Sequence, residues 1–131
     1  MVEVNGYTIE PGVDLTRADL DGANLSEANL RRAVADGRTV WPDDFDPDVA
    51  GVYEIGPGAN LEGAYLELAD LTGANLAGAN LSEAHLTRAN LRGANLSGVD
   101  LTGADLRRAR ANENTTWPEG FDPETAGVIF E

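Results

Sequence analysis

The sequence has 131 residues and a formal net charge of −14, from 23 acidic residues and nine basic residues that are all arginine. There is no cysteine, which excludes a disulfide scaffold, a Cys-ligated zinc site and a thiol nucleophile. The acidity argues against binding nucleic acid or an anionic membrane through a basic surface. The opening MVEVNGYTIE lacks the basic and apolar regions of a signal peptide, and no apolar run is long enough to span a bilayer, so we expect a cytoplasmic protein.

Two runs of five-residue repeats occupy residues 13–35 and 59–111, with the consensus Ala-Asn/Asp-Leu-x-x. A period of five fits neither the 3.6 residues of an α-helix nor the two-residue alternation of a strand. It fits a chain that turns one corner per repeat, in which the alanine and the leucine two positions later both point inward. Four corners then close a coil, and stacked coils are expected to lie about 4.8 Å apart.

Leucine occupies the central position of fourteen repeats, which predicts a leucine interior. These residues are Leu15, Leu20, Leu25, Leu30 and every fifth residue from Leu61 to Leu106. The last repeat position is often glycine, which suits a corner with positive φ. Arginine or glutamate stands there in other repeats, so we expect that not every corner requires positive φ.

These Ala-Asn-Leu-x-Gly runs resemble the pentapeptide-repeat family, whose fold is a right-handed quadrilateral β-helix. The resemblance covers sixteen repeats in the two runs. It implies an all-β solenoid of about four coils that ends in capping segments. It also raises one function of the family, because some members mimic duplex DNA, bind topoisomerases such as gyrase, and protect them from quinolones or inhibit them.

Each repeat run is followed by the same phrase, TVWPDDFDPDVAGV at 39–52 and TTWPEGFDPETAGV at 115–128. Because a stack of coils exposes unpaired backbone and apolar interior at its ends, we interpret both segments as caps. The aromatic residues expected to cover the leucine column are Trp41, Phe45, Trp117 and Phe121. The Asp-Pro-x-x-Ala-Gly ends predict a short helical turn in each cap. Similar endings occur at the tail of family members.

The repeat runs also open alike, so the chain is an internal duplication of residues 7–52 and 53–128. We predict a single domain, 1–131, in which 36–58 is a cap-like insertion and 112–131 is the C-terminal cap. The five repeats of the first run are too few to bury their own leucines. One continuous helix from which 36–58 bulges as a loop is the favoured arrangement. A separate small barrel that pairs with another molecule is the alternative.

No catalytic residue, cofactor site or metal site is predicted. His85, the only histidine, has no Ser or Cys partner set by spacing, which favours a stacked surface residue over a general base. The segment 44–48 imitates the start of a calcium loop, but Val49 and Ile55 stand where that loop needs glycine and glutamate. A filled tube offers no cleft for paired acids, so we do not expect an enzyme.

The acidic charge lies mostly outside the repeats, because the two repeat runs carry only −1 each. A stack of about four coils would span about 19 Å, over which duplex DNA presents about eleven phosphate charges. The coils therefore carry too little charge to imitate DNA well. A DNA-mimicking, gyrase-binding protein of the quinolone-resistance type remains the alternative function.

Repeats four apart share a wall of the coil, which predicts a column of Tyr65, His85 and Asp105. The residues predicted to contact a partner on this wall are Tyr65, Leu68, His85, Arg88, Arg107 and Arg108. A solvated ladder with local ion pairs is the competing interpretation. We predict a non-catalytic module that binds or scaffolds another protein, with no direct contact to nucleic acid or membrane. End-to-end or cap contacts would allow a homodimer.

Overall fold

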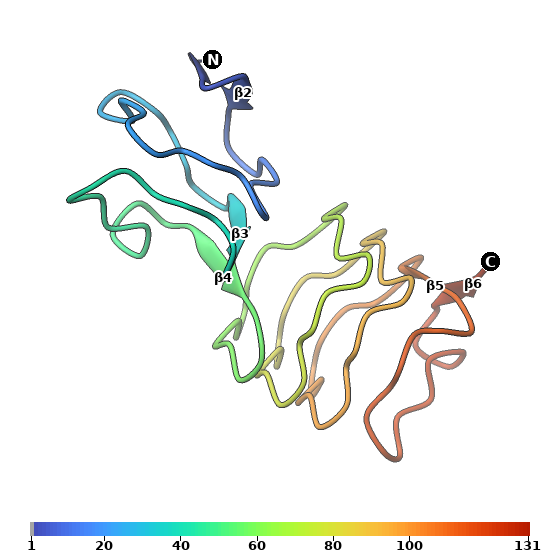
Figure 1. Ribbon diagram of the computed structural model, residues 1–131. Coiled ribbons are helices and arrows are strands. Elements are labelled where there is room, and N and C mark those ends of the chain that lie inside the picture. Colours follow the sequence, from blue (N-terminus) through green and yellow to red (C-terminus); the bar gives the residue numbers. More distant parts are fainter. Residues whose placement is uncertain (1) are drawn as a thin grey trace. The chain divides into compact units, whose positions relative to one another are not determined.

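The computed structural model describes residues 2–131, apart from the side chain of Val2. The chain forms two compact units, Met1–Glu54 and Ile55–Glu131, and each is described here by itself. The strands are β1 (Val2–Val4), β2 (Tyr7–Ile9), β3 (Val34–Asp36), β4 (Tyr53–Ile55), β5 (Arg110–Ala111) and β6 (Ile129–Phe130) (Figure 1). In residues 2–131 we find no helix long and apolar enough to cross a membrane.

The unit Met1–Glu54 begins with a hairpin that was not predicted. Strands β1 and β2 pair antiparallel, with Val4 opposite Tyr7. Asn5 and Gly6 connect them with φ of 49° and 85°, the positive values that a tight type I′ turn requires. The Asn-Gly pair between two short apolar-alternating segments is the sequence signal that would have identified this hairpin.

The repeats pair in parallel with residues twenty positions later. In the unit Ile55–Glu131, Asn60 pairs with Asn80, and Asn80 with Asp100. The Leu61 N–H donates to the Asn80 carbonyl at 2.8 Å, and the Asn80 N–H donates to the Ala59 carbonyl at 2.9 Å. Figure 1 shows the resulting turns of this unit stacked one beside the next. The register thus has the four repeats per coil that the five-residue period predicts.

The predicted leucine interior is confirmed, because all fourteen central leucines are buried. Leu86, Leu91 and Leu96 have no exposed surface, and Leu101 is the most exposed at 9%. Burial of each leucine contributes about 1.5–3 kcal/mol before the entropy of ordering the chain is subtracted. The stacked leucines therefore form the centre of the apolar core in each unit.

The polar residue before each leucine stabilises the corner that follows. The Asn80 side-chain oxygen accepts a hydrogen bond from the Ser82 N–H at 3.0 Å. The corner itself closes with a bond from the Ala84 N–H to the Leu81 carbonyl at 3.0 Å. Asn and Asp can fold their side chains back onto the backbone two residues on, which explains their recurrence at this position.

The expectation that not every corner requires positive φ is confirmed by Glu27, which is not among the residues with positive φ, but most other corners that lack glycine do adopt it. The non-glycine corner residues with φ between 61° and 65° are Arg17, Arg32, Leu68, Glu83, Arg88 and Arg108. In these corners the N–H of the fourth residue donates a hydrogen bond to the carbonyl of the first, and the third residue has positive φ. This is the geometry of a type II turn. Stacking imposes this geometry on side chains that would otherwise avoid it, at a cost of about 1–2 kcal/mol each.

The segment after each repeat run pairs with its own repeats in the same way. In the first unit the Val40 N–H donates to the Ala18 carbonyl at 2.9 Å, and the Tyr53 N–H to the Ala33 carbonyl at 2.8 Å. In the second unit the same bonds join Thr116 to Ala94 and Ile129 to Ala109, each 76 residues later. Val40, Gly51 and Tyr53 therefore bond to the repeats of their unit through the backbone. Whether the two repeat runs form one continuous helix stays a prediction.

The aromatic residues of the caps stack in pairs. The ring centroids of Trp41 and Phe45 are 5.2 Å apart, and those of Trp117 and Phe121 are 5.4 Å apart. Trp41 and Phe45 are half-buried and pack against the core of their unit. Where short helical turns were predicted, residues 46–52 form a hydrogen-bonded turn, with the Ala50 N–H 3.3 Å from the Asp46 carbonyl. None of residues 2–131 is helical.

Candidate protein-contact face

The predicted column of Tyr65, His85 and Asp105 is present in the structure. The three residues pair in parallel on successive coils. The Tyr65 and His85 rings stack with centroids 4.9 Å apart and an interplanar angle of 12°. Both aromatic rings replace the Asn or Asp that forms the corner in other repeats, and both are exposed.

Asp105 ends this column and holds Arg107. The Arg107 Nε donates to Asp105 Oδ1 at 2.9 Å, and Nη2 donates to Oδ2 at 2.7 Å. This side-chain pair, helped by the Arg107 N–H and by the nearby His85, lowers the pKa of Asp105 to about 2. The Asp105 carboxylate therefore stays ionised near neutral pH. Arg107 forms an ion pair with it although the Arg107 side chain is 77% exposed.

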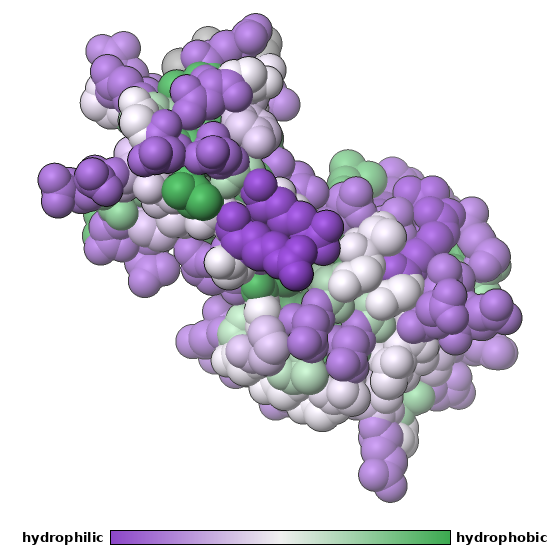
Figure 2. Space-filling model, viewed as in Figure 1, coloured by the Kyte–Doolittle hydropathy of each residue, from purple (hydrophilic) through white to green (hydrophobic). Residues whose placement is uncertain are grey.

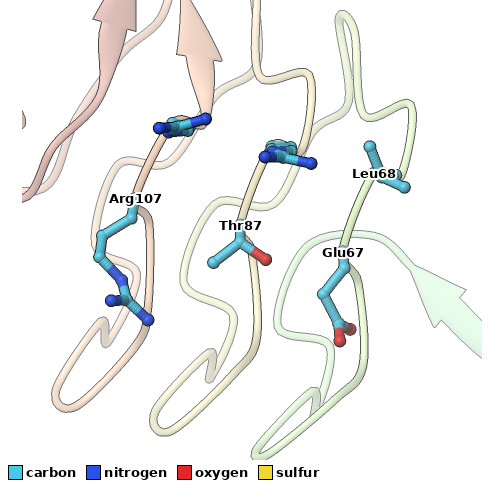
Figure 3. A pocket seen from close by; sticks show the side chains of 6 residues that line it. Glu67, Leu68, Thr87 and Arg107 are labelled. Atoms are coloured by element: carbon cyan, nitrogen blue, oxygen red, sulfur yellow. The ribbon is translucent and has the colours of Figure 1, made fainter.

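A shallow groove of about 420 Å³ lies at the corner next to this column. Its lining comes in pairs from three successive coils, Glu67 and Leu68, Thr87 and Arg88, and Arg107 and Arg108. Figure 3 shows Glu67, Thr87 and Arg107 projecting from three adjacent turns, with Leu68 beside Glu67. Leu68 is 73% exposed, which is unusual for a large apolar side chain.

Arg88 and Arg108 lie one coil apart in this groove, and both are exposed. Their backbone is held by bonds from the Arg88 N–H to the Arg107 carbonyl at 3.2 Å and from the Arg108 N–H to the Gly127 carbonyl at 2.8 Å. Within residues 2–131 neither guanidinium forms an ion pair. The groove therefore presents two cations whose charge is not matched by a bonded carboxylate.

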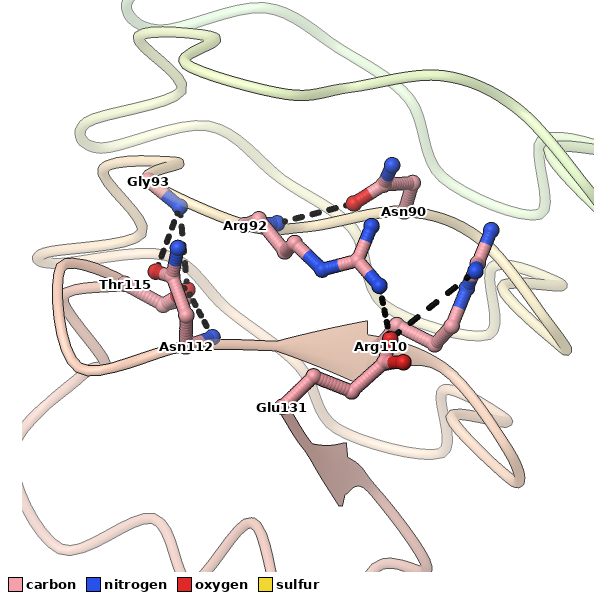
Figure 4. Close-up of polar contacts among 7 residues, drawn as sticks. All are labelled: Asn90, Arg92, Gly93, Arg110, Asn112, Thr115 and Glu131. Carbon is pink, nitrogen blue, oxygen red and sulfur yellow. Dashed lines mark hydrogen bonds and ion pairs between the residues drawn. The ribbon is translucent and has the colours of Figure 1, made fainter.

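Sequence reasoning missed two further arginines on the wall that follows this corner. Arg110 pairs with Asn90 on the wall, and Arg92 begins the next corner. Both side chains converge on the Glu131 carboxylate, which hydrogen bonds to Arg92 and lies 3.8 Å from Arg110 (Figure 4). All five arginines of the unit Ile55–Glu131 thus lie on one wall and its two corners. The available signal was their position in the sequence, since Arg92 follows Arg88 by four residues and Arg110 follows Arg108 by two.

Apolar surface is sparse elsewhere. Figure 2 shows mostly hydrophilic residues on the visible face, with hydrophobic atoms in small separate patches. Within residues 3–131, the large exposed hydrophobic residues are Val40, Val49, Tyr65, Leu68, Ile129 and Phe130. Two of the six, Tyr65 and Leu68, belong to the predicted face. Residues 2–131 contain no group of three or more acidic or histidine side chains arranged to hold a metal ion.

Five-residue repeats that stack at twenty-residue register around buried leucines define a pentapeptide architecture. The chain belongs to the pentapeptide repeat family, because the family model for pentapeptide repeats matches it in 8 copies over residues 11–37, 58–88 and 69–108. This confirms the resemblance predicted from the repeats. No curated protein matches the sequence.

Two solved structures of pentapeptide repeat proteins are similar to this chain. Rfr23 from the cyanobacterium Cyanothece 51142 has 36% identity and a TM-score of 0.50, over 86% of this chain and 69% of that chain. The protein alr5209 from Nostoc Pcc 7120 has 31% identity and a TM-score of 0.36, over 57% of this chain and 83% of that chain. The likeness to Rfr23 supports the pentapeptide-repeat β-helix as the fold class; the hand and the number of coils stay predictions.

Proposed function

We propose that this protein is a non-catalytic binding module that contacts another protein through the contact face, defined as Tyr65, Leu68, His85, Arg88, Arg107 and Arg108. Pentapeptide repeat proteins are generally structural or binding modules. The observation that carries the proposal is the groove, where an exposed leucine lies beside two arginines without ion pairs. Protein interfaces are enriched in aromatic residues and arginine, and their anchors occupy such recesses.

The stacked coils would hold these groups in fixed positions. Leu68, Arg88 and Arg108 all carry positive φ, and each corner backbone is hydrogen bonded to the next coil. A rigid backbone lowers the entropy lost on binding, because only the long side chains need to be ordered. A face built on such corners is therefore suited to binding without rearrangement of the scaffold.

Affinity capture with reversed charges tests this proposal. The wild-type protein and an Arg88→Glu/Arg108→Glu variant are used as bait under the same conditions, and captured proteins are quantified by mass spectrometry. The matched control, Arg31→Glu/Arg38→Glu, makes the same charge change at exposed positions of the unit Met1–Glu54. We expect a partner that is captured by the wild type and the control and lost with the Arg88/Arg108 variant. Equal capture by all three would refute the choice of face.

The second candidate, a DNA-mimicking protein that binds gyrase, is supported by the acids on a different wall. Asn60, Asn80 and Asp100 pair along that wall, and the Glu83 carboxylate lies beside Gly103 at the next corner. The low charge of the repeats makes this the weaker proposal. A gyrase supercoiling assay decides it, since an unchanged rate at micromolar protein would remove this function.

A further inference from the structure

We infer that Arg88 and Arg108 bind the carboxylates of an extended acidic peptide segment, with Leu68 contacting an apolar side chain of the same segment. This inference rests on the proposed function and names the chemistry of its partner. Three features of the wall support it: the carboxylates that its other arginines already hold, the spacing of the groove residues, and the charge of the whole chain.

The wall already binds carboxylates in two places. Arg107 holds the Asp105 carboxylate through two hydrogen bonds of 2.9 and 2.7 Å. Arg92 and Arg110, from adjacent coils, share the Glu131 carboxylate (Figure 4). Arg92 and Arg110 thus show that two guanidinium groups on adjacent coils can both pair with a single carboxylate. Arg88 and Arg108 have the same one-coil separation and no such partner within residues 2–131.

The spacing of the groove suits an extended peptide that runs across the coils. Leu68, Arg88 and Arg108 occupy equivalent corner positions at twenty-residue intervals. With coils about 4.8 Å apart, the leucine and the far arginine are separated by about 10 Å, which an extended chain covers in about three residues. The segment expected to fit therefore carries an apolar residue followed within three or four positions by acidic residues.

Charge favours a short acidic peptide over nucleic acid. The whole chain carries −14, and Glu67 lies in the groove itself. A long polyanion would be repelled by the acidic residues outside the arginine wall. A short acidic peptide would contact the arginine wall alone and would meet less of this repulsion. Arginine also pairs with a carboxylate through two parallel hydrogen bonds, as Arg107 does with Asp105.

Fluorescence anisotropy with defined probes tests the inference. The probe is a labelled peptide of about twelve residues with one leucine followed by glutamates, which spans the groove when extended. The comparison probes are the same peptide with glutamine for glutamate and a single-stranded oligonucleotide of equal length. We expect the acidic peptide to bind the full chain and the Arg88→Gln/Arg108→Gln variant to bind it about tenfold more weakly. The Arg31→Gln/Arg38→Gln control is expected to bind like the wild type.

Two further measurements do not depend on the folding of the arginine double variant. The affinity of the wild-type protein for the acidic peptide should fall as salt is added, because the contacts are exposed ion pairs. Leu68→Ala, which leaves the arginines in place, should weaken binding by about threefold. Binding that the arginine double variant retains in full, equal affinity for the glutamine peptide, or tighter binding of the oligonucleotide would each overturn the inference.

The inference and the proposed function fail separately. If affinity capture depends on Arg88 and Arg108 but the acidic peptide does not bind, the contact face stands and the acidic class of partner is wrong. If the peptide binds at the arginines but no cellular partner is lost with the charge-reversal variant, the peptide site stands and the proposed function is refuted.

Discussion

At the scale of single residues, the second position of each repeat decides whether a side chain stabilises the corner or stays exposed on the wall. Asn and Asp fold back to accept the backbone N–H two residues on, as Asn80 does. Tyr65 and His85 occupy the same position but stack on each other and remain exposed. Asp105 does both, because it accepts the Arg107 N–H at 3.2 Å and also holds the Arg107 side chain. Surface chemistry can thus vary while the leucine interior stays the same.

The pKa of Asp105 should depend on Arg107. The Arg107 side chain is the main cause of the lowered pKa of about 2, so Arg107→Ala should raise it toward the unfolded value of about 3.9. Because the folded pKa is below the unfolded one, this carboxylate stabilises the fold above about pH 4, and the contribution is lost as the pH falls toward 2. Carboxyl NMR titration measures the shift. The pKa of Asp100, lowered by Thr102, serves as the internal control and should not move.

A corner glycine should resist substitution even where space is available. Gly73 has φ of 69°, and a Cβ at this position would meet nothing within 4 Å. Gly73→Ala should therefore lower the free energy of unfolding by about 1 kcal/mol through backbone strain alone. Thr72→Ala, an exposed neighbour in the same corner, should change it by less than about 0.5 kcal/mol. Urea denaturation measures both, and equal effects would show that strain is not the cause.

At the scale of elements, the duplicated caps are joined to their coils by equivalent threonines, Thr39, which is half-buried, and Thr115, which is buried. The Thr39 hydroxyl donates to the Leu15 carbonyl at 2.8 Å, and the Thr115 hydroxyl donates to the Leu91 carbonyl at 2.8 Å. Thr115 also accepts the N–H groups of Asn112 and Gly93. The threonine therefore replaces the backbone pairing that the repeat would supply if it continued.

Removal of this hydroxyl should destabilise the unit Ile55–Glu131. Thr115→Val keeps the shape but leaves the Leu91 carbonyl and the Asn112 N–H without this partner, at a cost of about 1–3 kcal/mol. Thr116→Val is the matched control, because Thr116 is exposed and its counterpart Val40 in the first unit is already valine. Chemical denaturation compares the two variants. Equal stability of Thr115→Val and the wild type would contradict the role of the hydroxyl.

Strand β4 carries an acid whose ionisation opposes folding. Burial, with help from Asp48 and Asp36, raises the pKa of Glu54. A carboxyl whose folded pKa exceeds the unfolded one favours the protonated form, so stability falls as the pH rises from the unfolded value of about 4.3 through the folded pKa. Glu54→Gln should therefore raise the melting temperature at pH 7 but not at pH 4. Glu62→Gln, the same substitution at an exposed repeat position, is the matched control for the change of side chain.

At the scale of the whole molecule, charge is distributed unevenly between scaffold and caps. The two repeat runs contribute −2 to the total of −14, and the other segments contribute the remainder. The coils are therefore nearly neutral, and within Ile55–Glu131 their arginines gather on one wall and its corners. The acidic groups outside the repeats therefore repel one another. The wall that carries the arginines of Ile55–Glu131 differs from them in the sign of its charge.

This distribution predicts that salt stabilises the protein. Raising NaCl from about 0.01 M to about 1 M shortens the Debye length from about 30 Å to about 3 Å and so screens the repulsion among the acidic groups. The melting temperature should rise over this range. A melting temperature that stays constant would show that self-repulsion contributes little to stability, and would also dismiss adaptation of the protein to high salt.

The sequence by itself determined the buried leucines, the twenty-residue register and the family. It could do so because alanine and leucine two positions apart can share one side of the chain only if the chain turns once per repeat. Only the tertiary structure decided which corners adopt positive φ, since stacking against the next coil imposes it on Leu68 and Arg88 as well as on glycine. It also decided which arginines are paired. Glu131 reaches Arg92 across 39 positions of sequence, and a repeat pattern cannot encode a contact made by a residue outside the repeats.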